Sequence, residues 1–360
     1  MAKLYAPAVV RVTGLLVATL LASSLFACGD DGAAPRDDGS DAGPAPDAFV
    51  DAGPPLAPLE DAHTCVEGAA SAAIAWESLQ NPILRLDDHA LKDVSVRHHE
   101  GRWWLFGSRI AGDPFRFRLG VFTSSDLSEW TLESEWDDEA VGGLASPDVT
   151  RHPAGYVAVY NSHTTDVEGA LPKLYHRVAP DLAGLSDAPS ERLAESVFGI
   201  PIERLIDAAL AHTEDGLLLA FKRFQTFTLA LAPSGRLEGP WEILGEAAIA
   251  DTVENYQFLP IDGGWHLLAT TIPAHEPRLY ARGERWTAWT EVTTFAVPEE
   301  DWNTDERANA AFLCDGRAVD GHWYLFYAGS TETESFDGRG YAAVGVARST
   351  DLEAWSVPGG

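Results

Sequence analysis

Five short units of the sequence each begin with a polar residue, and four of these residues are acidic. They are Asp93, Asp148, Asp207, Glu254 and Asn309, at steps of 55, 59, 47 and 55 residues. Carboxyl groups that meet in one site can share general acid–base work: a protonated group donates to a leaving oxygen while an ionised group activates water. A third acid nearby keeps the donor protonated by repulsion. The chemistry therefore depends on whether the fold brings these residues together.

Each of these residues opens the same strand–turn–strand pattern. The first unit, KDVSVRHHEGRWWLFGS at residues 92–108, has a short alternating strand, a turn containing Gly and a strongly apolar strand. A third strand and a closing segment follow, such as VFTSSDLSEWTL at 121–132 and VARSTDLEAWSV at 346–357. Four strands in each repeat of about 50 residues are typical of β-propellers. The sequence predicts an all-β fold, a five-bladed β-propeller with four antiparallel strands per blade.

The propeller hypothesis answers the question about the acids. The innermost strand of each blade lines a central channel, so we expect the acidic residues to occupy equivalent places around one mouth of it. Asp148 is expected to have a structural or supporting role, and any single acid could simply cap a turn in so acidic a chain. The segment IAWESLQNPILRL at 74–86 is expected to supply a closing strand to the last blade.

The N-terminal part differs in composition from the repeats. Residues 1–28 combine Lys3 and Arg11 with an apolar run that ends at Cys28, which resembles a bacterial lipoprotein signal with a lipidated cysteine. Ordinary secretion with an incidental cysteine is the alternative. Residues 29–62 are almost entirely Gly, Ala, Pro and Asp, which predicts a disordered linker. We expect an exported protein, lipid-anchored to the cell envelope or secreted, with the propeller at 63–360.

Charge and cysteine content limit the partners. The formal net charge of −30 repels phosphate backbones and argues against nucleic acid, but neutral polysaccharides remain compatible. We expect a monomer that meets the membrane only through the lipid anchor. No metal-binding motif is visible. Cys65 and Cys314 could pair in an oxidising compartment or stay as two buried thiols, and the sequence leaves both open.

Three motifs resemble clan F of the glycoside hydrolases, families 43 and 62, which are five-bladed propellers. LKDVSV at 91–96 is similar to the motif of the general base and offers Asp93. LIDAALAHTEDG at 205–216 offers Asp207 as the residue that tunes the acid, and VENYQFLPIDGGWHLL at 253–268 offers Glu254 as the general acid. The resemblance also implies that Lys92 contacts the sugar, and that Arg339 and Tyr341 in SFDGRGYAAVG are substrate-binding.

The resemblance implies an inverting glycoside hydrolase acting on plant-type polysaccharide or oligosaccharide, with α-L-arabinofuranosidase or β-xylosidase as the expected activity. Hydrolysis by carboxyl groups requires no cofactor, although some members of the clan hold calcium in the channel. Val94 and Asn255 depart from the usual Pro and Gly, which indicates a divergent member. A carbohydrate-binding lipoprotein with little turnover is the alternative, and a retaining fructosidase or a glycoside phosphorylase is a third reading.

Overall fold

The computed structural model describes a ring of β-sheets. The chain divides into two units, residues 1–50 and 51–360. The described residues, all in the second unit, are 56–57, 59, 61–67, 74–112, 115–138, 142–163, 171–193, 204–223, 225–331 and 343–359. The predicted signal, Cys28 and most of the predicted linker lie outside this part of the chain. No helix in the described ranges is long and apolar enough to cross a membrane.

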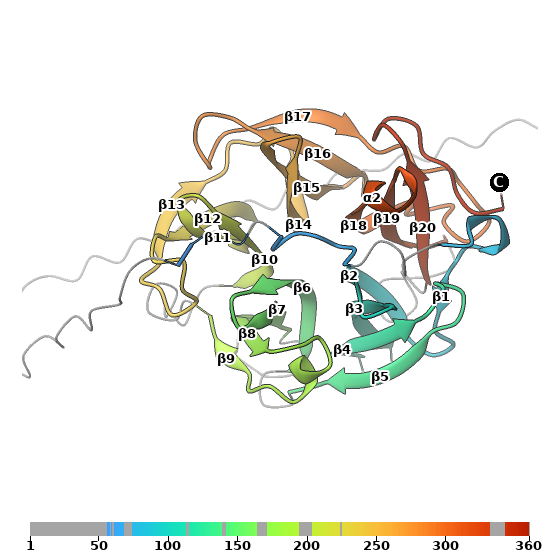
Figure 1. Cartoon of the computed structure of the whole chain (residues 1–360), viewed down its shortest axis with the longest axis horizontal. Coiled ribbons are helices and arrows are strands. Elements are labelled where there is room, and N and C mark those ends of the chain that lie inside the picture. The colour runs from blue at the N-terminus through green and yellow to red at the C-terminus, as the bar shows by residue number, and fades with distance from the viewer. Residues whose placement is uncertain are drawn as a thin grey trace, which may run out of the picture. The chain divides into compact units, whose positions relative to one another are not determined.

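Five four-stranded antiparallel sheets form the blades, and the predicted fold is confirmed (Figure 1). From the channel outward, blade 1 contains β2 (Ala90–His99), β3 (Arg102–Gly112), β4 (Phe115–Ser124) and β5 (Thr131–Trp136). Blade 2 contains β6 (Leu144–His152), β7 (Gly155–Ser162), β8 (Leu174–Ala179) and β9 (Glu191–Arg192). Blade 3 contains β10 (Leu205–Thr213), β11 (Gly216–Arg223), β12 (Thr226–Ala232) and β13 (Glu242–Glu246). Blade 4 contains β14 (Thr252–Ile261), β15 (Gly264–Ile272), β16 (Pro277–Arg282) and β17 (Trp289–Thr294). Blade 5 contains β18 (Asn309–Gly316), β19 (His322–Gly329), β20 (Ala343–Ser349) and β1 (Leu84–Arg85).

The ring closes through a strand from the start of the domain. Leu84 and Arg85 of β1 pair with Val344 and Ala343 of β20, so the last blade takes its outer strand from the segment predicted to provide it. The described helical elements are single turns: η2 (Trp76–Ser78), η4 (Gly184–Ser186) and α2 (Arg317–Asp320).

The core lies between the blades rather than inside them. Each of five apolar clusters joins two neighbouring sheets; one packs Leu91 and Leu105 of blade 1 against Phe326 and Val346 of blade 5. Alternation along each strand sends one set of side chains to each neighbouring blade. Because both faces of a blade are covered, the strands are apolar on both sides and the polar residues collect at their ends.

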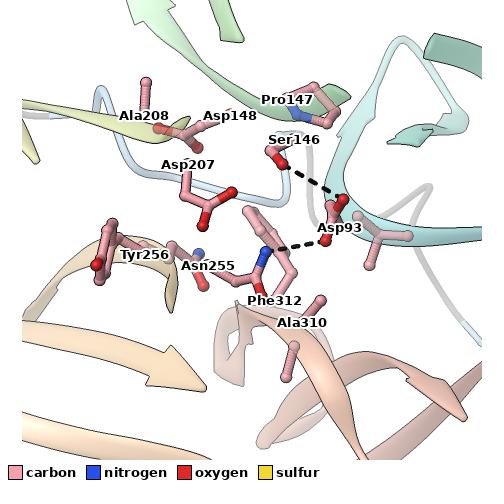
Figure 2. A pocket seen from close by; sticks show the side chains of 13 residues that line it. Asp93, Ser146, Pro147, Asp148, Asp207, Ala208, Asn255, Tyr256, Ala310 and Phe312 are labelled. Atoms are coloured by element: carbon pink, nitrogen blue, oxygen red, sulfur yellow. Dashed lines mark hydrogen bonds between the residues drawn. The ribbon is translucent and has the colours of Figure 1, made fainter. Parts of the chain in front are cut away.

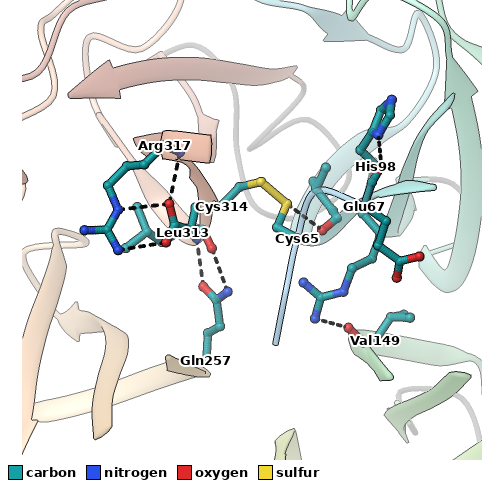
Figure 3. Close-up of a disulfide and its surroundings, with 11 residues drawn as sticks. Cys65, Glu67, His98, Val149, Gln257, Leu313, Cys314 and Arg317 are labelled. Atoms are coloured by element: carbon teal, nitrogen blue, oxygen red, sulfur yellow. Dashed lines mark hydrogen bonds and ion pairs between the residues drawn. A yellow bond between two sulfur atoms is a disulfide. The ribbon is translucent and has the colours of Figure 1, made fainter. Parts of the chain in front are cut away.

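A short N-terminal segment closes the channel at the end opposite the acidic residues. Val66 pairs with His98 near the end of β2, and the backbone N–H of Arg151 on β6 donates to Ala62 (3.0 Å). Figure 1 shows this blue segment across the centre of the ring. Cys65 forms a disulfide with Cys314 of β18, which resolves the alternative left open by the sequence (Figure 3).

Candidate functional site

A β-bulge interrupts the inner strand of every blade at the same place. The pairing with the second strand shifts after Lys92, Ala145, Ile206, Glu254 and Asn309. The next residue in each blade has a positive φ between 48° and 57°; these are Asp93, Ser146, Asp207, Asn255 and Ala310. A bulge re-aims side chains, and a left-handed non-glycine residue costs about 1–2 kcal/mol. Such strain persists where the surrounding structure imposes it, often at a functional site.

The bulges correct the predicted equivalence of the five leading residues. Asp93 and Asp207 are equivalent, but Glu254 and Asn309 stand one residue before the strained position and Asp148 stands two residues after Ser146. Asp148 is buried and its Oδ2 accepts the backbone N–H of Leu210 in blade 3 (3.0 Å). It therefore joins two blades, in agreement with the structural role expected for it.

Asp93, Asp207 and Glu254 line one cavity of about 310 Å³ at the mouth of the channel. This volume is at the lower end of the range for small-molecule sites, roughly 300–1,000 Å³. Asp93 and Asp207 are each only 6% exposed, and the Glu254 side chain is 19% exposed. The three acids predicted from separate blades therefore meet at one place, with Glu254 nearest to solvent. Their catalytic roles stay a prediction.

The Asp93 carboxylate is held by groups from three blades. Its Oδ1 accepts a hydrogen bond from Asn255 Nδ2 (2.9 Å), its Oδ2 accepts one from Ser146 Oγ (3.4 Å), and Lys92 Nζ lies 3.4 Å from Oδ1. Figure 2 shows the carboxylate between Ser146 and Asn255, with Asp207 pointing into the same pocket. Donors on several sides fix the orientation of this carboxylate.

Asp207 is the acid whose proton is held most firmly. Burial raises its pKa to about 6, with Glu254 and then Asp93 adding to the rise and Lys92 and Lys222 opposing it. The backbone N–H of Asp207 donates to Asn161 Oδ1 (3.0 Å), which anchors the strained residue to blade 2. Near neutral pH this carboxyl is in exchange between its protonated and ionised forms.

Glu254 shows the opposite balance. Burial raises its pKa, but the positive charges of Lys92 and Lys222, a hydrogen bond from Lys222 and the nearby His275 together hold the pKa below its usual range. Lys222 Nζ lies 3.0 Å from Glu254 Oε2, and both side chains are largely buried. In the free protein Glu254 is therefore a carboxylate, and the proton of the neighbouring pair resides on Asp207.

The cavity contains further residues that the sequence did not single out. Lys92 lies in it as expected, together with Phe117, His163, Arg204, His275 and Glu306. The rings of Phe117 and His163 stack with centroids 3.8 Å apart. His163 and His275 follow the second strands of blades 2 and 4, which end at the mouth. A search of the sequence for polar residues just after these strands could have found both. Arg339 and Tyr341 lie outside the described residues.

The described residues do not fit the calcium ion that the resemblance allowed. No group of three or more His, Cys, Asp or Glu side chains among them could hold a metal. Asp148, which lines the narrow space below the cavity, lies beside the buried guanidinium of Arg97. A fixed positive charge next to the available carboxylate disfavours a second cation. We derive no step through a metal.

Comparison with known proteins identifies the fold. No protein family matches the chain by sequence, and no curated protein does. A thermostable family 43 glycoside hydrolase is 12% identical, with a TM-score of 0.53 over 79% of this chain and 96% of that one. The GH43 endo-arabinanase from Bacillus licheniformis is 11% identical (TM-score 0.52; 76% and 96%). A GH62 hydrolase solved with xylotriose is 12% identical (TM-score 0.51; 73% and 93%).

Proposed function

We propose that the protein is a glycoside hydrolase of the inverting type. The observation that carries this proposal is the meeting of Asp93, Asp207 and Glu254 in one cavity in three different electrostatic settings. Asp93 is oriented by donors, Asp207 has a raised pKa, and Glu254 is the most exposed of the three. The fold shared with family 43 and family 62 hydrolases supports the same reading.

In the proposed reaction, water attacks the anomeric carbon and gives a proton to Asp93. The bond from that carbon to the leaving oxygen breaks, and the oxygen takes a proton from Glu254. Asp207 keeps a proton available to Glu254 and restrains its charge by repulsion. Positioned general acids and bases of this kind each contribute about 10²–10⁴ in rate.

The substrate class rests on the cavity and on the related folds. The stacked Phe117 and His163 give an aromatic wall against which a sugar face could pack, and Lys92 supplies a donor for its hydroxyl groups. One similar structure is an endo-arabinanase and another holds xylotriose. We propose α-L-arabinofuranosides or β-xylosides of plant-type polysaccharide as substrates, with Arg339 and Tyr341 as additional contacts.

The experiment measures hydrolysis of 4-nitrophenyl α-L-arabinofuranoside, 4-nitrophenyl β-D-xyloside, arabinan and arabinoxylan by the full-length chain. We expect Glu254→Gln to lower the rate on the polysaccharides by about 10²–10⁴-fold, with a smaller loss on the aryl glycosides, whose leaving groups need less protonation. Proton NMR of the first product should show the inverted anomer.

Asp148→Asn is the matched control, because Asp148 is a buried carboxyl that joins two blades. It lines the narrower pocket beside Asp93 and Asp207 but not the larger cavity that contains Glu254. Asn keeps a carbonyl oxygen that can accept the Leu210 N–H, so hydrolysis should be retained. Equal losses in Asp148→Asn and Glu254→Gln would remove Glu254 from the mechanism. No hydrolysis of any of the four substrates by the wild type would overturn the proposal for this substrate class.

A carbohydrate-binding protein without turnover is the second candidate, favoured by the ion pair between Lys222 and Glu254. A carboxylate held by a buried ammonium cannot donate a proton until that pairing is relieved. Binding of arabinan or arabinoxylan oligosaccharides, measured by calorimetry and unaccompanied by hydrolysis, would select this candidate.

We also propose export, with lipid attachment at Cys28. The described residues that lead into the propeller lie at the channel end away from the cavity, where Ala62 accepts a hydrogen bond from Arg151. Fractionation of cells with labelled fatty acid, comparing wild type with Cys28→Ala, tests the attachment.

A further inference from the structure

A repeated hydrogen bond links neighbouring blades at the bulges. In each blade, one residue of the second strand pairs with the last residue of the inner strand before the bulge. In blades 1, 2 and 4 this second-strand residue has a side-chain oxygen. This oxygen accepts the backbone N–H of the strained residue in the next blade: Ser146 to Ser108 (2.8 Å), Asp207 to Asn161 (3.0 Å) and Ala310 to Thr270 (3.0 Å). The fold thus favours a short side chain with an acceptor at this position.

Blades 3 and 5 depart from this pattern: blade 5 has Ala328 at this position, and blade 3 has a lysine. Lys222 pairs with Ile206, the last residue before the bulge, so it occupies the same position as Asn161 in blade 2. An ammonium group has no acceptor. Lys222 instead crosses to blade 4 and donates to the Glu254 carboxylate at 3.0 Å. Burying a lysine is costly even when it is paired, so stability alone would favour Ser, Thr or Asn here.

We propose that Lys222 is a positioning residue that holds Glu254 as an oriented carboxylate in the free protein and leaves the mobile proton of the pair on Asp207. The inference rests on the proposed hydrolase function and adds a regulated step to it. Other charged or titratable groups also act on Glu254 or on its partners, and they are Lys92 and Asp93 on β2, Asp207 on β10, His275 after β15 and Glu306 before β18.

The proton balance follows from this arrangement. When a glycoside enters, the proton passes from Asp207 to Glu254, which releases the hydrogen bond from Lys222 and then protonates the leaving oxygen. The proton of the attacking water goes to Asp93 and is then released to solvent, and solvent returns one proton to Asp207 before the next turnover. Activity should therefore fall as pH rises through the range in which the Asp207–Glu254 pair loses its proton.

The test replaces Lys222 with asparagine, which removes the positive charge, and with arginine, which keeps it. Lys222→Asn introduces the residue found at this position in blade 2, and its oxygen should accept the N–H of Asn255. The alkaline limb of the kcat/KM profile should move upward by about one pH unit, since an opposite charge this close shifts a carboxyl pKa by about 1–3 units. Lys222→Arg keeps the charge and should restore the wild-type limb.

Two controls separate this role from simpler ones. Lys173→Asn removes another buried lysine that does not line the cavity, and its profile should match the wild type. If Lys222 served only to bind sugar, Lys222→Asn would raise KM and leave the alkaline limb in place. That result, or an equal displacement in Lys222→Arg, would overturn the proposal.

A measurement without substrate keeps this inference apart from the hydrolase proposal. In protein labelled with carbon-13 at the glutamate carboxyl, the Glu254 resonance is assigned by its loss in Glu254→Gln and titrated in the wild type and in Lys222→Asn. We expect a higher titration midpoint in Lys222→Asn. An unchanged midpoint contradicts the role of Lys222 even in an active enzyme, whereas a shift in a protein without hydrolytic activity contradicts only the hydrolase proposal.

Discussion

The two ends of the central channel are built in opposite ways. At the mouth, five strained residues sit on bulges, and the buried acids Asp93 and Asp207 repel each other. At the far end, the segment 61–67 lies beside β2, where Val66 pairs with His98. Cys65 of this segment is bonded to Cys314, and His63 packs edge-on against Trp265. Burial lowers the pKa of His63, with Arg97 and His212 adding to the effect, so this imidazole is held neutral.

This difference shows that the contacts that stabilise the fold and the residues proposed for the chemistry lie at opposite ends of the channel. Strain and like charges at the mouth destabilise the folded state, and they persist only because the remaining structure fixes them. The disulfide and the backbone pairing at the far end add stability without touching the cavity. Variants at the far end should therefore change stability but not the site, and variants at the mouth should relieve strain or repulsion.

The largest effect is expected at the far end. Cys65 and Cys314 are 249 positions apart, and a cross-link over such a loop is worth about 5 kcal/mol in the loop-entropy model. Replacing both with serine should lower the free energy of unfolding in urea by several kcal/mol, while the folded variant keeps the wild-type profile of activity against pH. A loss under about 1 kcal/mol, or a displaced profile, would contradict the separation of the two ends.

The next effect concerns Asp207 and depends on pH. Its pKa is raised from 3.8 in the unfolded chain to about 6 in the folded protein, so the folded state binds this proton more tightly. Its contribution is complete below about pH 4 and is lost as pH rises through 6, up to about 3 kcal/mol. Asp207→Asn should remove that slope from the pH dependence of the unfolding free energy.

Asp148→Asn is the comparison for this slope, since burial also raises the pKa of Asp148 to about 6. It should remove a separate part of the slope without affecting hydrolysis, because Asp148 joins blades rather than lining the larger cavity. If Asp207→Asn leaves the pH dependence of unfolding unchanged between pH 4 and pH 7, then the raised pKa of Asp207, caused by burial and by repulsion from Glu254 and Asp93, is absent.

The smallest effect tests the strain itself. Ala310 has a φ of 48°, where glycine is at no disadvantage, so Ala310→Gly should be neutral or stabilising within about 1 kcal/mol. Ala209, buried on the inner strand of blade 3 without positive φ, is the matched site, and Ala209→Gly should destabilise by about 1 kcal/mol or more. Urea unfolding of both variants measures the contrast, and equal losses would show that the bulge stores no strain.

Much of the fold could be predicted because it is repeated. The strand–turn–strand pattern recurs five times, and its spacing indicated five blades and a closing strand near residue 84. The repeat offered five leading residues, and the resemblance of three motifs to those of clan F glycoside hydrolases selected Asp93, Asp207 and Glu254 among them. The register of the bulges could not be predicted, since each shifts the pairing without interrupting the alternating pattern. The spacing alone therefore predicts Asp148, Glu254 and Asn309 as equivalents of Asp93, and the bulges show that none of them occupies the strained position.

The sequence by itself determined the blade number, the order of the strands and the acids at the channel mouth, because short-range alternation and a repeat of about 50 residues encode these features. Only the tertiary structure decided that Cys65 meets Cys314, that the pKa of Asp207 is raised and that Lys222 reaches Glu254. The physical reason is distance along the chain. Burial and electrostatic coupling arise between blades, from residues whose proximity is created only when the ring closes.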